Sequence, residues 1–153
     1  MLDRPTPNLD EGNNNPEGSR DLVDEIINER NRFNNLIVSL QMGEHYMLGT
    51  FQEILKEKEE DGDREIWAKR VERAREISES IERLLEKHDL SKEEINRYIG
   101  IFEIGESDAK EKLSNNKTMD EILQIQEKIG GICDALIGSG CTYEEIGVLR
   151  QNE

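Results

Sequence analysis

Large apolar residues recur every seven positions in the first half of this chain. Seven residues make two helical turns, so side chains at this spacing lie along one line of an α-helix. Apolar neighbours on both sides widen that line into a stripe. The line consists of Ile26, Phe33, Leu40, Met47 and Ile54, and its neighbours are Val23, Ile37 and Phe51. The pattern predicts a helix from Ser19 or Asp21 to about Glu60.

Two glycines, Gly43 and Gly49, are the weak points of this predicted helix. Each costs about 1 kcal/mol relative to alanine in a helix interior. The heptad register crosses both glycines without a skip. We therefore expect one helix of about 40 residues, which would be about 60 Å long, with Gly43 as the place for a bend. Two separate helices are the alternative.

A second amphipathic helix is predicted from Asp63 to about Lys87, after a turn at residues 61–63. Its apolar stripe consists of Trp67, Val71, Ala74, Ile77, Ile81, Leu84 and Leu85. So short a link between two long helices forces them to run antiparallel. Residues 20–90 are therefore predicted to form a long antiparallel hairpin with a coiled-coil-like seam. The expected core of this hairpin is Met47, Phe51, Ile54, Trp67, Ala74 and Ile81.

The second helix is too short to cover the whole stripe of the first. The uncovered residues need another partner, either the C-terminal helices or a different chain. We therefore take four residues as candidates for an interface with a partner. They are Ile26, Phe33, Ile37 and Leu40.

Three capping boxes predict shorter helices after residue 90. In each one a hydroxyl residue precedes a glutamate by three positions, a pairing that satisfies two free amides at a helix start. The pairs are Ser91 with Glu94, Thr118 with Glu121, and Thr142 with Glu145. Ser107 is expected to cap a further small helix that runs to Leu113. Residues 91–153 are thus predicted to form a cluster of short helices that packs as one domain with the hairpin.

The first nineteen residues have a different composition. All three prolines of the chain lie there, together with a run of asparagines. Such a composition resists packing into a core. Residues 1–19 are therefore predicted to be an N-terminal arm that is flexible or held by a partner. The predicted fold class is all-α.

The chain is strongly acidic. Of its 153 residues 36% are charged and 34% are hydrophobic, and the net charge is −15, spread along the whole sequence. Phosphate binding needs clustered Lys and Arg, so this charge argues against nucleic acid and anionic membranes as partners. Two interpretations stay open. In the first, the acidic residues form an ordinary solvated surface. In the second, they form a surface that binds a basic partner and even mimics nucleic acid.

No residue pattern of known catalytic or metal sites is present. The two histidines, His45 and His88, are far apart, and neither has a glutamate three positions before it, as a di-iron bundle requires. The two cysteines do not form a Cys-x-x-Cys pair, so we expect reduced thiols rather than a zinc site. We therefore predict no catalytic residue, no cofactor and no metal. The N-terminal segment lacks a secretory signal and no apolar run spans a membrane, which predicts an intracellular protein.

These patterns favour a non-enzymatic subunit for protein interaction or assembly, an adaptor or structural component. It would use the uncovered apolar stripe and the N-terminal arm, with partners that include copies of itself. Viral or other large particles are one setting for such a subunit, and nothing in the sequence selects it. One alternative is an acidic regulator or inhibitor that masks a basic, nucleic-acid-binding surface of a partner. The other is an enzyme with an unrecognised site.

Overall fold

The computed structural model describes residues 16–150, with side chains from residue 21 onward. Over this range the regular structure is entirely α-helical, which confirms the predicted all-α class. Most of the predicted N-terminal arm lies outside the described residues, but its last residues, from Pro16, are already helical. The helices are α1 (Pro16–Arg32), α2 (Asn34–Met42), α3 (Leu48–Glu57), α4 (Asp61–Lys87), α5 (Lys92–Glu103), α6 (Glu106–Leu113), α7 (Asn116–Gly138) and α8 (Tyr143–Ile146).

The prediction of one long helix over residues 20–60 is wrong, because α1, α2 and α3 occupy that range. The break at Phe33 is slight, since its amide still donates to Glu29 O at 2.9 Å and its carbonyl still accepts from Ile37 N at 2.8 Å. The break at Gly43 is complete. Gly43 has a φ of +76°, a left-handed conformation that ends a helix and that glycine adopts without steric cost.

Two buried serines hold the turn between α2 and α3. The backbone amide of His45 donates to Ser78 Oγ at 2.8 Å, and the amide of Tyr46 donates to Ser39 Oγ at 2.9 Å. Both amides would have been bonded inside a continuous helix. The two hydroxyls replace those bonds, so the chain can change direction at Gly43 without leaving buried donors unpaired.

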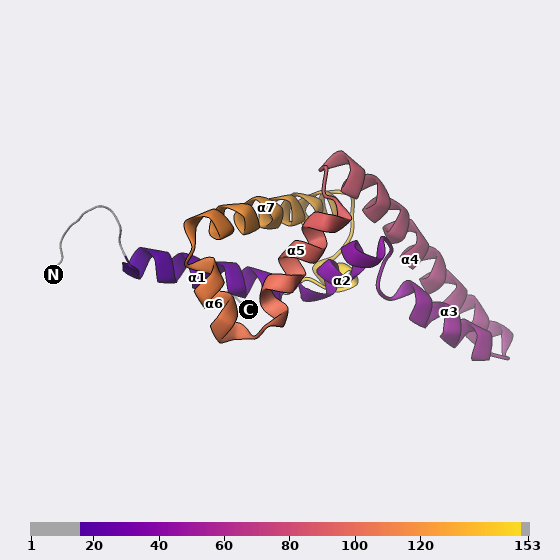
Figure 1. The fold of residues 1–153 in the computed structure, drawn as a ribbon. Coiled ribbons are helices and arrows are strands. Elements are labelled where there is room, and N and C mark those ends of the chain that lie inside the picture. The colour runs from indigo at the N-terminus through magenta and orange to yellow at the C-terminus, as the bar shows by residue number, and fades with distance from the viewer. Residues whose placement is uncertain (1–15, 151–153) are drawn as a thin grey trace.

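A body of six packed segments forms the larger part of the molecule. Helices α1, α2, α5, α6 and α7 and the C-terminal half of α4 enclose one apolar core, which runs in sequence from Val23 to Val148. Figure 1 shows α7 and α1 lying across this body with α5 and α6 beside them. A partly buried polar contact joins α7, α5 and α1. The side-chain amide of Gln126 donates to Tyr98 Oη at 2.5 Å and to the carbonyl of Ile26 at 3.0 Å.

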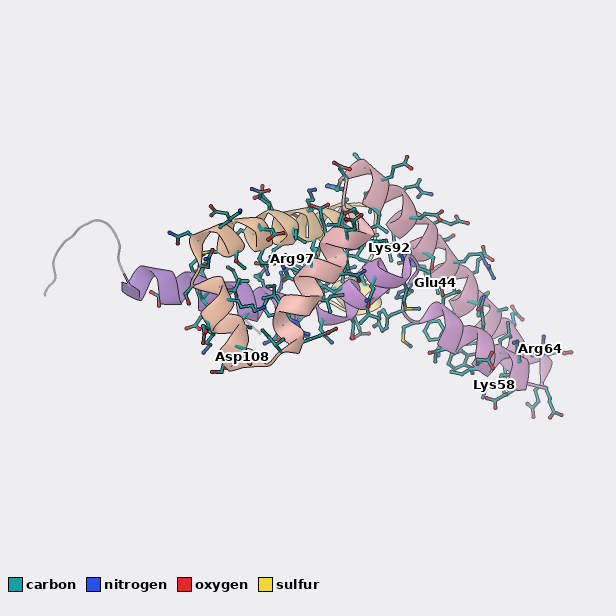
Figure 2. The ribbon with its side chains drawn as sticks, viewed as in Figure 1. Glu44, Lys58, Arg64, Lys92, Arg97 and Asp108 are labelled. Atoms are coloured by element: carbon teal, nitrogen blue, oxygen red, sulfur yellow. The ribbon has the colours of Figure 1, made fainter. Side chains whose placement is uncertain are left out.

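A hairpin of two helices projects from the body (Figure 1). It consists of α3 and the N-terminal half of α4, residues 48–75, and we call it the α3–α4 hairpin. Its two helices are joined by residues 58–60 and pack against each other. Arg64 Nη1 closes the far end by donating to Leu55 O at 3.3 Å and Lys58 O at 2.9 Å. Figure 2 shows Lys58 and Arg64 at this end.

Two of the three predicted capping boxes are confirmed. The Ser91 hydroxyl accepts from the amide of Glu94 at 3.1 Å, and the Glu94 carboxylate accepts from the amide of Ser91 at 3.0 Å. Thr142 and Glu145 form the same pair of bonds at the start of α8. These boxes fix where α5 and α8 begin.

The third box and the predicted cap at Ser107 are wrong. α7 begins before Thr118, because the Asn115 side chain accepts from the amide of Thr118 at 3.1 Å. Glu121 instead forms an ion pair with Arg97 at 3.0 Å. α6 begins after Gly105, whose φ of +107° turns the chain, and Ser107 lies within the first turn. An asparagine and a glycine thus start these helices in place of the predicted hydroxyl residues.

The observed caps lead to a prediction on stability. Ser91→Ala removes a side-chain acceptor at the start of α5, and we expect the free energy of unfolding to fall by about 1 kcal/mol. Ser107→Ala is the matched control, and we expect a change below about 0.5 kcal/mol because that serine makes no cap. Urea unfolding of the three proteins measures both values. Equal losses in the two variants would contradict the assignment of the caps.

Candidate functional site

The four predicted interface residues lie in the body core, not on the surface. Ile26 is 1% exposed, Phe33 3%, Ile37 5% and Leu40 0%. The expected exposed stripe is therefore absent. The break at Gly43 separates α1 and α2 from the hairpin, and the apolar faces of α5, α6 and α7 cover them. Of the two partners that the sequence left open, the C-terminal helices are the ones these residues meet.

The residues predicted for the hairpin core do not form one cluster. Phe51 and Trp67 contact edge to face with ring centroids 5.7 Å apart, and Phe51 also packs against the cluster that contains the buried Ala74. Met47 and Ile54 are only half-buried. Ile81 is fully buried, but in the body core and not in the hairpin. The hairpin therefore has a small core of its own, which consists of Leu48, Val71 and Ala74 with Phe51 and Leu55 packed against them.

One exposed side of the hairpin carries an apolar residue between opposite charges. Ile66 is 52% exposed, the most exposed isoleucine of the described residues. Positions three and four away on a helix lie on the same side, so four neighbours share its face. We call this set the Ile66 face. It comprises Gly62, Asp63, Ile66, Lys69 and Arg70, all of them exposed.

The Ile66 face was not predicted, because Ile66 lies outside the apolar stripe of its helix. A stripe predicts core, and a lone apolar residue outside it is usually an ordinary surface residue. The usable signal was the ordering of charge around it. Asp63 precedes Ile66 by three positions and Lys69 follows it by three.

Charge is distributed unevenly between the hairpin and the rest of the chain. Residues 48–75 hold seven basic and eight acidic residues, a net charge of −1, so the remaining residues carry −14 of the total −15. The hairpin is also polarised along its length. Its outer part, residues 55–65, has three basic and six acidic residues, a net −3, whereas residues 48–54 and 66–75 have four basic and two acidic residues, a net +2.

A pocket of about 380 Å³ lies where the hairpin meets the body. Ion pairing closes one side of it, since Arg73 Nε donates to Glu145 Oε2 at 2.8 Å and Arg73 Nη2 donates to Glu145 Oε1 at 3.2 Å. The Arg73 bonds, helped by the Thr142 amide, lower the pKa of Glu145 to about 2. These contacts tie α8 to α4 and thereby orient the hairpin on the body.

His45 lies in the same junction and is almost completely buried. Burial lowers the pKa of His45 to about 4; the nearby Glu145 raises it and Arg73 lowers it further. Its ring meets Tyr46 edge to face, with centroids 4.9 Å apart, and no described residue hydrogen-bonds its Nδ1 atom. The imidazole is therefore neutral near pH 7, and burial disfavours its protonation in the junction.

The Arg73–Glu145 contact leads to a prediction on pH dependence. Glu145→Gln keeps an acceptor for the cap but loses the charge, so we expect a stability loss below about 1 kcal/mol near neutral pH, given the partial exposure of both side chains. A carboxylate whose pKa is lowered in the folded chain stabilises the fold at pH values above its ordinary pKa. The difference in unfolding free energy between Glu145→Gln and wild type should therefore narrow as the pH falls from about 4.5 toward about 2.

Glu144→Gln is the matched control for this prediction. The Glu144 carboxylate is exposed and adjacent in sequence, and the substitution removes the same charge. Urea unfolding at a series of pH values measures the two variants against wild type. A difference for Glu145→Gln that stays constant with pH, or that Glu144→Gln reproduces, would contradict the role of the ion pair.

The remaining candidate groups form no reactive or metal-binding cluster in the described part of the chain. Within residues 16–150 no group of three or more His, Cys, Asp and Glu side chains is placed to hold a metal ion. Both cysteines are buried and unbridged, and burial raises the pKa of Cys141 and raises that of Cys133 to about 11, so both are thiols near pH 7. The described helices include none with the length and apolarity that a membrane crossing needs.

Comparison with protein-family models, with curated proteins and with solved structures gave no match for this chain.

Proposed function

We propose that this protein is a non-enzymatic adaptor or structural subunit that contacts partner proteins through the α3–α4 hairpin. The observation that carries the proposal is the projection of this hairpin from a body whose apolar core is enclosed by its own helices. The predicted docking role thus moves from the buried stripe of α1 and α2 to the hairpin. The coiled-coil-like seam expected between the two helices of the hairpin belongs to this proposal as the packing of α3 on α4.

The physical support is the incomplete burial of the hairpin. Two helices alone cannot enclose their apolar side chains, and Phe51, Ile54 and Trp67 are only half-buried while Ile66 is exposed. Removing apolar surface from water stabilises a complex by roughly 25 cal/mol per Å². A partner helix laid along the hairpin would bury these side chains, and it would meet a surface on which positive and negative charges nearly balance, in place of the acidic body.

A comparison of two exposed isoleucines tests the proposal. Ile66→Glu changes the hairpin, and Ile104→Glu makes the same substitution on the body, where Ile104 is 43% exposed. Tagged wild-type and variant chains would be cross-linked in the native source, and the bound proteins identified. We expect Ile66→Glu to lose a partner that wild type and Ile104→Glu both retain.

The opposite pattern would overturn the proposed function. If Ile66→Glu retains every partner that wild type binds, the hairpin is not the contacting surface. If the partner is lost only from Ile104→Glu, the contact lies on the body. Circular dichroism of both variants checks that the helices have formed, so a lost partner reports on the surface and not on unfolding.

The acidity of the body supports a second candidate function. Outside the hairpin the chain has thirteen basic and twenty-seven acidic residues. A surface of this charge attracts a basic partner and speeds its association at low salt. The protein would then act as a regulator that masks a basic, nucleic-acid-binding surface. Capture of a basic partner that is lost with added salt would support this function, and binding unaffected by salt would contradict it.

A further inference from the structure

We infer that the occupant of the Ile66 face is a second copy of this chain, with the two α4 helices antiparallel across a two-fold axis at Ile66. This inference rests on the proposed function and names its partner. A two-fold interface brings the same surface of both chains together, so the surface has to be complementary to itself. The Ile66 face meets that condition residue by residue.

The order of charges about Ile66 supplies the first argument. In an antiparallel pair with the axis at Ile66, a residue three positions before it faces the residue three positions after it in the other copy. Asp63 of each copy then faces Lys69 of the other, so one type of contact occurs twice. Within its own helix Lys69 makes only a weak ion pair. It lies 3.8 Å from Glu65, and both side chains are mostly exposed.

The next position outward is complementary in shape. Four residues after Ile66, Arg70 faces Gly62 of the other copy. Nothing lies within 4 Å of the site where a Cβ atom of Gly62 would stand, so the surface there is open. The guanidinium of Arg70 lies 4.4 Å from the centroid of the Trp67 ring, which holds it beside the centre of the face. It would reach the acidic first turn of the partner's α4, which contains Asp61 and Asp63.

The apolar centre of the contact is Ile66 itself, which would pack against its own copy on the axis. Its 52% exposure in the isolated chain would fall in the pair. Opposite charges on each side of an apolar centre set the register of two helices and their direction. A parallel pair would instead place Asp63 against Asp63 and Lys69 against Lys69.

The charge of the whole molecule favours the same direction. Antiparallel hairpins place the acidic outer part of one copy, net −3, against the basic inner part of the other, net +2. They also keep the two bodies at opposite ends of the contact, about 30 Å of helix apart. Because the bodies hold most of the negative charge, a parallel pair would bring like charges together.

Charge exchange at two positions tests the inference by sedimentation equilibrium over a range of protein concentrations at low salt. Asp63→Lys and Lys69→Asp each turn two attractive contacts into two repulsive ones. We expect each to weaken self-association about tenfold or more. The double variant D63K/K69D restores opposite charges across the axis, and we expect its association within about threefold of wild type.

Glu72→Lys is the control, since it reverses an exposed charge on the same helix but away from the Ile66 face. Its association constant should stay within about threefold of wild type. Circular dichroism of all four variants shows that α4 is retained. Loss of the weak Glu65–Lys69 pair affects folding equally in Lys69→Asp and in the double variant, so recovery in the double variant isolates the contact between copies.

Three outcomes would overturn the inference. They are a wild-type chain that sediments as a monomer at every concentration, self-association that neither single exchange weakens, and a double variant that does not recover. None of these outcomes decides the proposed function. A monomer that still loses a different protein in the Ile66→Glu capture experiment would support docking through the hairpin and reject self-association.

Discussion

Leu40→Ala is expected to lower the free energy of unfolding by about 2–5 kcal/mol. Leu40 has no exposed surface and lies in the body core, where α2 packs against α5 and α4. Truncation to alanine removes its apolar contacts and leaves a cavity that the surrounding helices fill only in part. Urea unfolding of wild type and variant measures the loss. The Leu40→Ala protein should still fold, and its oligomeric state should be the same as that of wild type.

Val38→Ala is the matched control for this prediction. Val38 lies on the same helix, two positions earlier, but it is exposed. We expect its effect on stability to stay within about 0.5 kcal/mol. A Leu40→Ala protein that keeps its stability and loses self-association would show that the stripe of α1 and α2 is an interface. The structure predicts the reverse, a loss of stability with no specific loss of association.

Acidification is expected to destabilise the protein through His45. The pKa of His45 is about 4 in the folded chain and 6.5 as its ordinary value, because burial disfavours the charged imidazole. Between these values the unfolded chain binds a proton that the folded chain does not. The stability present above about pH 6.5 therefore falls as the pH drops to about 4, by as much as about 3 kcal/mol.

The two histidines of the chain make the measurement specific. His45→Asn removes the titrating group, so the slope of unfolding free energy against pH should flatten between about 6.5 and about 4. His88→Asn is the control. His88 is half-buried at the end of α4 and packs its ring over Gly131, so its substitution removes a histidine without changing the junction. Urea unfolding at several pH values gives the slopes. A His45→Asn protein with the wild-type slope would contradict the burial argument.

The helical class and several helix starts could be predicted from local patterns. The Ser91 and Thr142 boxes worked because both partners of each cap lie within four residues, so no distant contact decides them. The apolar stripe of α4 was likewise predictable, since its spacing continues from the hairpin into the body. These confirmed features depend only on neighbours in sequence. The box at Thr118 and the cap at Ser107 were equally local and were wrong, because Asn115 and Gly105 precede those helices instead.

The direction of the chain after Met42 could not be predicted in this way. A heptad register continues across a break whenever the helices on both sides face the same core, so it could not tell one helix from several. Gly43 was identified as a weak point, but the turn that follows it is held by a distant residue. The His45 amide donates to the hydroxyl of Ser78, which lies thirty-three residues from His45 in sequence. Long-range hydrogen bonds of this kind decide the fold and leave no local pattern.

The location of the exposed surface was missed for a related reason. Ile26 and Phe33 were expected to be uncovered because residues 20–60 were taken as one straight helix, longer than the second helix that packs against it. With the chain turned at Gly43, both residues lie in the body core together with side chains of α7. Ile66 then becomes the informative residue, although it belongs to no stripe.

Hydrogen–deuterium exchange of the chain, compared between its native assembly and the isolated dilute protein, tests the central claim most directly. We expect residues 61–75 of α4 to exchange more slowly in the assembly than in the isolated chain. Residues 23–40 should be protected in both states, because their side chains are already buried within one chain. Slower exchange confined to residues 23–40, with no change over residues 61–75, would contradict docking through the α3–α4 hairpin.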